Sequence, residues 1–287
     1  MSWYGYSNLV KQKYRTQLST ICKLSNLLKE KGIDMLIMKG VSLSSLYPVP
    51  EDRPSCDLDI YTYGKHMQIY NLMHENGILV EKDYKHDTFN YENSFVELHK
   101  LFVAEHSKAG RIINSFLEKT SSLEKCNIEG GLLYPGTKFN TIFLLRHMCS
   151  HLVREKVTIK NLCDFALFLK KEYIHHILSV VKVITNASMV NAWNAFVALC
   201  ADLFCQDYCY LYIGIPNKKL VKQLKEDILN DLSLIENEYN LIKRIQVKIK
   251  RILSRKWIFD NGLLPDNFWS EVVWGSLLEH VQRPSQI

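Results

Sequence analysis

The sequence has no apolar segment long enough to cross a lipid bilayer. The uninterrupted apolar run from Ala195 to Ala201 is far shorter than a membrane-spanning helix, and Asp202 ends it. The first residues, MSWYGYSNLVKQKYRTQ, are interrupted by polar and basic side chains, unlike the apolar core of a secretory signal peptide. We therefore expect a chain without a membrane span that is located in the cytoplasm.

Glycine and proline are scarce, with 12 and 7 residues, and none of the eight cysteines forms a CxxC pair. This composition argues against the disordered and collagen-like classes. Most cysteines lie in apolar patterns, where a thiol behaves as a small hydrophobic side chain, so a reducing compartment is expected. The formal net charge of +6 is mild. It permits a phosphorylated substrate without requiring nucleic acid.

The apolar pattern divides the chain into two regions. In the first region, helical spacing between Tyr14 and Leu28 is followed by strand-like segments at 33–38, 56–63, 78–84, 85–91 and 94–102. From about Lys138 the patterns are helical, at 139–153, 159–171, 187–204 and 271–281. We therefore expect an α+β fold, with a mixed sheet and flanking helices over residues 1–134 and an all-helical domain over residues 135–287.

Three carboxylates in the first region suggest a metal site. Asp57 and Asp59 are two residues apart on a predicted strand, so both side chains project from the same face. Glu97 lies in a mostly apolar strand, where a carboxylate is costly to bury unless something pairs with it. Neighbouring carboxylates repel each other, and Mg²⁺ removes that repulsion. If the two strands are neighbours, the three groups converge; for the aspartate pair alone, a chance pair on a solvent-facing strand is an equal alternative.

The segment upstream of the aspartates has the pattern of a phosphate site. The predicted strand at 33–38 ends in Lys39-Gly40 and leads into a short predicted helix. Such a junction presents backbone N–H groups and the positive end of a helix dipole to a phosphate, and Lys39 adds a positive charge. Purely structural roles are also open, a tight turn for Gly40 and a solvated strand end for Lys39.

The order of strand, glycine, helix, D-x-D and a later acidic strand resembles the polymerase-beta-type nucleotidyltransferase superfamily. In that superfamily, Gly followed by Gly or Ser usually enters the helix. Here Lys39-Gly40 stands at that place, with a valine after the glycine and Ser42 one residue later. The stretch MKGVSLSSLYPVPEDRPSCDLDI, together with E-L-H around Glu97, is similar to a bacterial branch of uncharacterised nucleotidyltransferases. The resemblance covers roughly residues 33–102.

The resemblance implies an enzyme that moves a nucleoside monophosphate from a nucleoside triphosphate to a hydroxyl acceptor. It implies two Mg²⁺ ions, with Mn²⁺ as an alternative metal. Asp57 and Asp59 would bind the ion that carries the triphosphate, and with Glu97 they would hold the second. The residues that the resemblance assigns to the phosphates are Lys39, Gly40, Ser42 and Arg53. Family membership does not identify the acceptor, which is a small molecule, a sugar or a protein.

Three other patterns have more than one interpretation. Arg53 either clamps the triphosphate through two hydrogen bonds or pairs with an acidic neighbour in its loop. His147 and His151 have the i,i+4 spacing of zinc ligands, although a structural role is the commoner reason for such a pair. The basic amphipathic segment 241–257 suits an anionic acceptor, RNA or a membrane surface, but most such helices simply pack one face and solvate the other.

Two hypotheses of other classes stand beside the enzyme. The first is a non-catalytic module on the same fold that senses a nucleotide or a partner, and the altered Lys39-Gly40 entry favours it. The second is nucleic-acid binding through the segment 241–257. It is the weaker of the two, and we do not expect a nucleic-acid partner.

Overall fold

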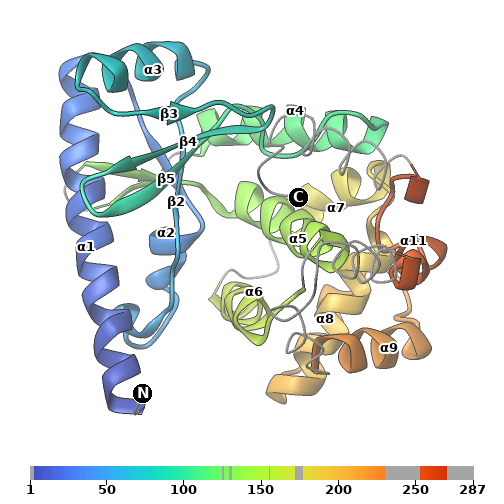
Figure 1. Cartoon of the computed structure of the whole chain (residues 1–287). Helices are drawn as coiled ribbons and strands as arrows, with labels where there is room; N and C mark the ends of the chain where they lie inside the picture. Colours follow the sequence, from blue (N-terminus) through green and yellow to red (C-terminus); the bar gives the residue numbers. More distant parts are fainter. Residues whose placement is uncertain are drawn as a thin grey trace, which may run out of the picture. The chain divides into compact units, whose positions relative to one another are not determined.

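Figure 1 shows the computed structural model of the chain. The structure describes residues 3–124, 126–128, 131–154, 156–171, 177–229 and 253–269. The chain divides into two compact units, Met1–Ala104 with Asn114–Asn140, and Glu105–Ile113 with Thr141–Ile287. One boundary precedes helix α4 (Lys108–Leu123), and the other two fall within α4 and within α5 (Thr137–Arg154). The sequence placed a division after residue 134, and the separate roles of the two halves stay a prediction.

The first unit contains a mixed sheet. Its described strands follow the order β3-β4-β5-β2-β1-β7-β6. The central strand β2 runs parallel to β5 and antiparallel to β1, while β4 and β5 form an antiparallel hairpin. The bounds are β1 (Leu36–Met38), β2 (Leu58–Tyr61), β3 (Val80–Glu81), β4 (His86–Tyr91), β5 (Ser94–His99), β6 (Cys126–Ile128) and β7 (Leu132–Tyr134). The predicted α+β fold class is confirmed.

The core of the first unit decides which face of the sheet is free for charged groups. Side chains alternate along a strand, so every second residue of β2 and β5 turns to the same face. The apolar set on these strands, Leu58, Ile60, Val96 and Leu98, belongs to one buried cluster with residues of α1 (Trp3–Glu30) and α3 (His66–Glu75). Figure 1 shows α1, in blue, running along the sheet. The alternate set, which includes Asp59 and Glu97, therefore turns to the opposite face.

Several short elements differ from the sequence-based expectation. The predicted strand at 33–38 contributes only the three residues of β1, and the one at 78–84 only the two of β3. Helix α4 and strands β6 and β7 were not predicted. Each of the two short strands has three residues, which are too few to show an alternating pattern. A short helix after Lys39 is confirmed as α2 (Gly40–Ser44), and a 3₁₀ turn, η1 (Pro50–Asp52), follows it.

The second unit is helical in its described part. Beyond α5 it contains α6 (Ile159–Lys171), α7 (Ile177–Asn186), α8 (Val190–Phe204), the 3₁₀ turn η3 (Cys209–Leu211), α9 (Lys218–Leu229) and α11 (Lys256–Asp260). Trp193 is fully buried, and its ring packs edge-on against Phe165, with the centroids 5.9 Å apart. The predicted helix at 271–281 and most of the basic segment 241–257 lie outside the described residues. Among the helices that are described, none is both long enough and apolar enough to traverse a bilayer.

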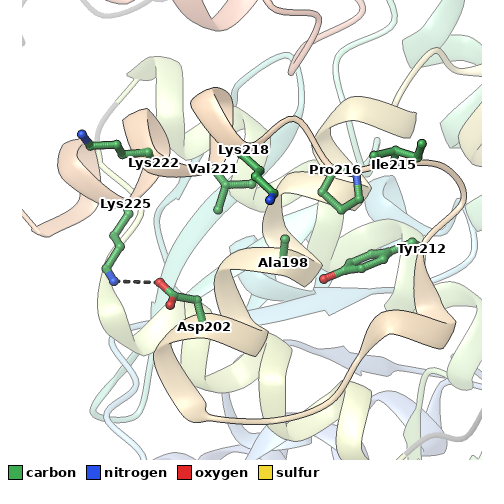
Figure 2. A pocket seen from close by; sticks show the side chains of 9 residues that line it. All are labelled: Ala198, Asp202, Tyr212, Ile215, Pro216, Lys218, Val221, Lys222 and Lys225. Carbon is green, nitrogen blue, oxygen red and sulfur yellow. Dashed lines mark hydrogen bonds and ion pairs between the residues drawn. The ribbon is translucent and has the colours of Figure 1, made fainter.

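Figure 2 shows a pocket of about 500 Å³ in the second unit, lined by α8, α9 and the segment that precedes α9. Its apolar wall includes Tyr212, and α9 contributes lysines to its edge. One of them, Lys225, forms an ion pair with Asp202 of α8 at 2.7 Å. This pocket belongs to a different unit from the carboxylates that the sequence singles out.

The position of the core predicts how β5 tolerates substitution. Replacement of the fully buried Leu98 by alanine removes apolar contacts and leaves a cavity, so we expect the free energy of unfolding to fall by about 2–5 kcal/mol. Phe95 on the same strand is 42% exposed, and its replacement by alanine is the control, with an expected loss below about 1 kcal/mol. Urea denaturation of both variants measures the difference. Equal losses would contradict this assignment of the two faces.

Candidate metal centre

The pairing of β2 with β5 brings two of the predicted carboxylates together. Asp59 and Glu97 are direct partners in the parallel ladder, so their side chains leave the sheet side by side on the same face. His99, two residues after Glu97, shares that face. One ligand atom from each of these three residues lies within 4.8 Å of the others. Asp59 and His99 are buried, and Glu97 is half-buried.

The ring of His99 is held between a carbonyl and the carboxylates. Its Nδ1 lies 3.3 Å from the carbonyl oxygen of Leu101. Its Nε2 lies 2.9 Å from Asp59 Oδ1 and 3.7 Å from Glu97 Oε2. Because carbonyl and carboxylate oxygens only accept, the contact with Leu101 needs a hydrogen on Nδ1 and the contact with Asp59 needs one on Nε2. A metal ion bound at Nε2 would take the place of that second hydrogen. Histidines that bind metals have this arrangement, with the far nitrogen donating to a carbonyl.

Asp57 is placed less tightly than the other two carboxylates. It precedes the first residue of β2, outside the ladder, and it is half-buried. Among the described residues it is not part of the three-residue group around Asp59. Burial raises the pKa of Asp57, and the negative charge of Asp59 raises it further. The structure thus brings Asp59 and Glu97 together, while Asp57 contributes charge from the end of the strand.

Lys39 contacts Asp59 directly, with 2.7 Å between Nζ and Oδ1. Burial alone would raise the pKa of Asp59, but the charge of Lys39 and the hydrogen bond with His99 outweigh it and hold the pKa well below its usual range. Burial would lower the pKa of Lys39, but Asp59 and Asp57 overcome that effect and raise it. The two groups therefore form a buried ion pair. The sequence assigned Lys39 to phosphates, and that role stays a prediction.

Gly40 is needed where β1 turns into α2. Its φ is +31°, and a Cβ atom built on it would lie 3.0 Å from Ser55 Oγ and 3.4 Å from the carbonyl oxygen of Asp57. The chain that leads into β2 therefore passes directly over this glycine. Ser42 donates its hydroxyl hydrogen to the carbonyl oxygen of Lys39 at 2.7 Å, so its side chain closes the first turn of α2. Contact of either residue with a phosphate stays a prediction.

Arg53 is buried in the loop between η1 and β2, and it donates a hydrogen bond to the carbonyl oxygen of Pro54 at 3.5 Å. The acidic neighbours that were its alternative partners have partners on α1. Glu51 accepts two hydrogen bonds from Arg15, at 2.8 and 3.0 Å, and Asp52 pairs with Lys11 at 3.4 Å. The loop is thus tied to α1 through its acidic residues. A phosphate role for Arg53 stays a prediction.

His86 was not singled out from the sequence, and it faces the same site. It is the ladder partner of His99, and the two ring centroids are 5.5 Å apart. Its Nε2 lies 3.7 Å from Glu97 Oε1, and burial lowers the pKa of His86 to about 4. The sequence did contain a signal that places His86 opposite His99. If Glu92-Asn93 is taken as a two-residue hairpin turn, counting outward from it pairs residue 86 with residue 99.

The donor set fits a divalent cation. Two carboxylate oxygens and one imidazole nitrogen converge, and they come from adjacent strands that hold them in place. Carboxylates suit Mg²⁺ and Mn²⁺, and imidazole suits transition metals, so the mixed set is compatible with Mn²⁺ as well as Mg²⁺.

The histidine pair on α5, His147 and His151, is in direct contact. The Nε2 atoms of the two rings lie 2.9 Å apart, a hydrogen-bonding distance. The structural interpretation of that pair accounts for this contact.

Comparisons with known proteins bear on the same part of the chain. The profile of a family described as uncharacterised nucleotidyltransferase matches residues 1–215. No curated protein sequence matches the chain. Among solved structures, the chain is similar to the polyadenylate synthase of Megavirus, with a TM-score of 0.34 and 11% sequence identity. That similarity covers 78% of this chain and 50% of the other, so the chain spans about half the length of the synthase.

The close approach at Gly40 predicts an unequal effect of alanine at two glycines. Gly32 also has a positive φ, of +67°, but nothing lies within 4 Å of a Cβ atom built there. Gly32→Ala should therefore cost only the backbone strain, about 1–2 kcal/mol. Gly40→Ala should cost about 1–3 kcal/mol more, because Ser55 and the strand behind it must move. Urea denaturation measures both losses, and the same loss for both variants would contradict the close approach.

Proposed function

Because the chain belongs to the family of uncharacterised nucleotidyltransferases, we propose that it moves a nucleoside monophosphate from a nucleoside triphosphate to a hydroxyl acceptor, using Mg²⁺ or Mn²⁺. The observation that supports this most is the parallel pairing that sets Asp59 beside Glu97, with His99 on the same face. Paired carboxylates in a mostly buried site carry a high electrostatic cost, and a divalent ion compensates it.

In this proposal, Asp59, Glu97 and His99 hold the ion, and Asp57 adds negative charge beside it. A bound divalent ion would supply positive charge for the triphosphate and would acidify the acceptor hydroxyl. Glu97 is the candidate to accept the hydroxyl proton, since it is the half-buried member of the group. The hydroxyl oxygen forms a bond to the α-phosphorus, the bond to the bridging oxygen breaks, and pyrophosphate leaves.

The phosphate contacts are proposed from the segment between β1 and β2. Lys39, Gly40 and Ser42 begin α2 next to the carboxylates, and Arg53 lies in the loop before Asp57. Cationic side chains and backbone N–H groups at such a turn neutralise the charge of the departing pyrophosphate. These four residues would orient the triphosphate, while the carboxylates serve the reacting α-phosphate.

The acceptor is proposed to be a hydroxyl of a small molecule, a sugar or a protein, and nucleic acid is not expected. The bacterial branch and the cytoplasmic location stay predictions from the sequence. A sensing module without turnover is the second candidate, because the Lys39 ammonium already occupies one oxygen of Asp59. Triphosphate binding that depends on a divalent ion, without pyrophosphate release across a broad acceptor panel, would identify the sensor.

Removal of the central carboxylates should abolish transfer. We expect Asp59→Asn and Glu97→Gln each to lower pyrophosphate release by at least about 100-fold, because each loses a charge that the reaction requires. The assay uses labelled nucleoside triphosphates, Mg²⁺ and a panel of hydroxyl acceptors. Glu92→Gln is the matched control, since Glu92 is exposed at the hairpin turn and pairs with Lys23 on the surface. Activity retained in Asp59→Asn would contradict the assignment of Asp59 to the catalytic site.

Replacement of His99 should weaken metal binding. We expect His99→Ala to reduce the affinity for Mn²⁺ by about 10–100-fold, because the variant lacks the Nε2 atom that lies beside the carboxylates. Titration calorimetry of the purified proteins measures the affinity, and thermal melting checks that the variant is folded. His74→Ala, at an exposed position of α3, serves as control. An unchanged affinity in a folded His99 variant would exclude the histidine as a ligand.

A further inference from the structure

One cation is already present at the candidate metal centre, and it belongs to the chain itself. The Nζ atom of Lys39 lies 2.7 Å from Asp59 Oδ1, and the two side chains are 14% and 1% exposed. We propose that the Lys39 ammonium is a resident cation of this site, so that the carboxylates take up one divalent ion instead of the two that the family resemblance implies. This inference rests on the proposed function, because it concerns the same site.

The geometry at Asp59 supports a single ion. A carboxylate that bridges two metal ions with both of its oxygens uses one oxygen for each ion. Here Lys39 occupies Oδ1, and His99 Nε2 lies 2.9 Å from the same oxygen. With the ammonium in place, Oδ2 is the oxygen that Asp59 can offer to a metal. Asp59 therefore lacks the second free oxygen that such a two-oxygen bridge requires.

The charge balance of the site also favours one bound divalent ion. Asp57, Asp59 and Glu97 carry three negative charges when ionised, and Lys39 returns one positive charge. A single divalent ion balances the remaining two charges. A second divalent ion would leave a surplus of positive charge among buried and half-buried groups, which is costly. A bound triphosphate lowers that cost, so in its presence the occupied Oδ1 of Asp59 is what limits the site to one ion.

The backbone of Lys39 supports a role for its side chain. Its φ of 45° and ψ of −143° lie in a region that residues other than glycine rarely adopt, at a typical cost of about 1–3 kcal/mol. The hydroxyl of Ser42 and the N–H of Leu43 both donate to the Lys39 carbonyl, so the start of α2 holds this conformation. A glycine would adopt it without strain. The chain instead has a lysine here, and the lysine contacts Asp59.

The number of bound ions tests the proposal without an activity assay. Metal-free protein is titrated with Mn²⁺ in the presence of a non-hydrolysable nucleoside triphosphate, and electron paramagnetic resonance follows the bound ions. We expect one protein-bound Mn²⁺ per chain with an uncoupled spectrum. Two ions bridged by one carboxylate would lie about 3.5–4 Å apart and give an exchange-coupled spectrum. A coupled pair in the unaltered protein would overturn the resident-cation proposal.

Variants at Lys39 test whether its ammonium limits the site to one bound ion. Lys39→Met removes the ammonium from Asp59 Oδ1, so the number of bound Mn²⁺ ions should rise from one to two and the coupled spectrum should appear. Lys39→Gln provides a second, polar variant if the methionine protein does not fold. Lys100→Met is the matched control, because it breaks another lysine–aspartate contact of 2.7 Å, to Asp87, and should leave one uncoupled ion. A single uncoupled ion in the folded Lys39 variants would contradict the proposal.

The same titration separates failure of this inference from failure of the proposed function. If the unaltered protein binds no Mn²⁺ with or without the triphosphate, the metal-dependent function fails and the inference fails with it. If Mn²⁺ binds and Asp59→Asn abolishes the binding, the metal centre is supported, and the ion count alone decides the role of Lys39. Two coupled ions in the unaltered protein would contradict only the resident-cation proposal and would leave the metal-dependent function standing.

Discussion

The repulsion between the carboxylates of Asp59 and Glu97 is the constraint on which the first unit depends. The parallel register of β2 and β5 places the two groups side by side, and the core holds that register. A slip of either strand by one residue would turn the carboxylate of that strand into the apolar cluster. The packing of α1 and α3 on the core face thus keeps the charges on the opposite face, where a compensating cation can reach them.

Two contacts compensate the negative charge of Asp59. Lys39 provides a full positive charge at 2.7 Å, and His99 provides a nitrogen at 2.9 Å. These two contacts explain why a carboxylate that is 1% exposed nevertheless has a pKa below its usual range. The ion pair has a structural cost, because Lys39 adopts a conformation better suited to glycine. Strain retained next to buried charges is typical of a functional site.

Much of this arrangement was predictable because it depends on local pattern. The D-x-D spacing placed two aspartates together, and an acidic residue within the apolar pattern of SFVELHKLF identified Glu97. His86 was missed, because its proximity to Glu97 follows from counting residues outward from a hairpin turn and from no motif. The contact between Lys39 and Asp59 joins residues twenty positions apart along the chain. It depends on the antiparallel pairing of Met38 with Asp59, which no composition or spacing reveals.

The sequence alone determined which chemical groups are present and which face of a strand each one shares, because a strand alternates its side chains with a period of two. It also indicated an α+β region followed by helices, and it carried the resemblance to nucleotidyltransferases. Only the tertiary structure decided which strands are neighbours, and therefore that Glu97 and His99 surround Asp59 while Asp57 lies outside that group. Strand order is set by the burial of apolar surface between distant segments, and the propensities of single residues do not specify it.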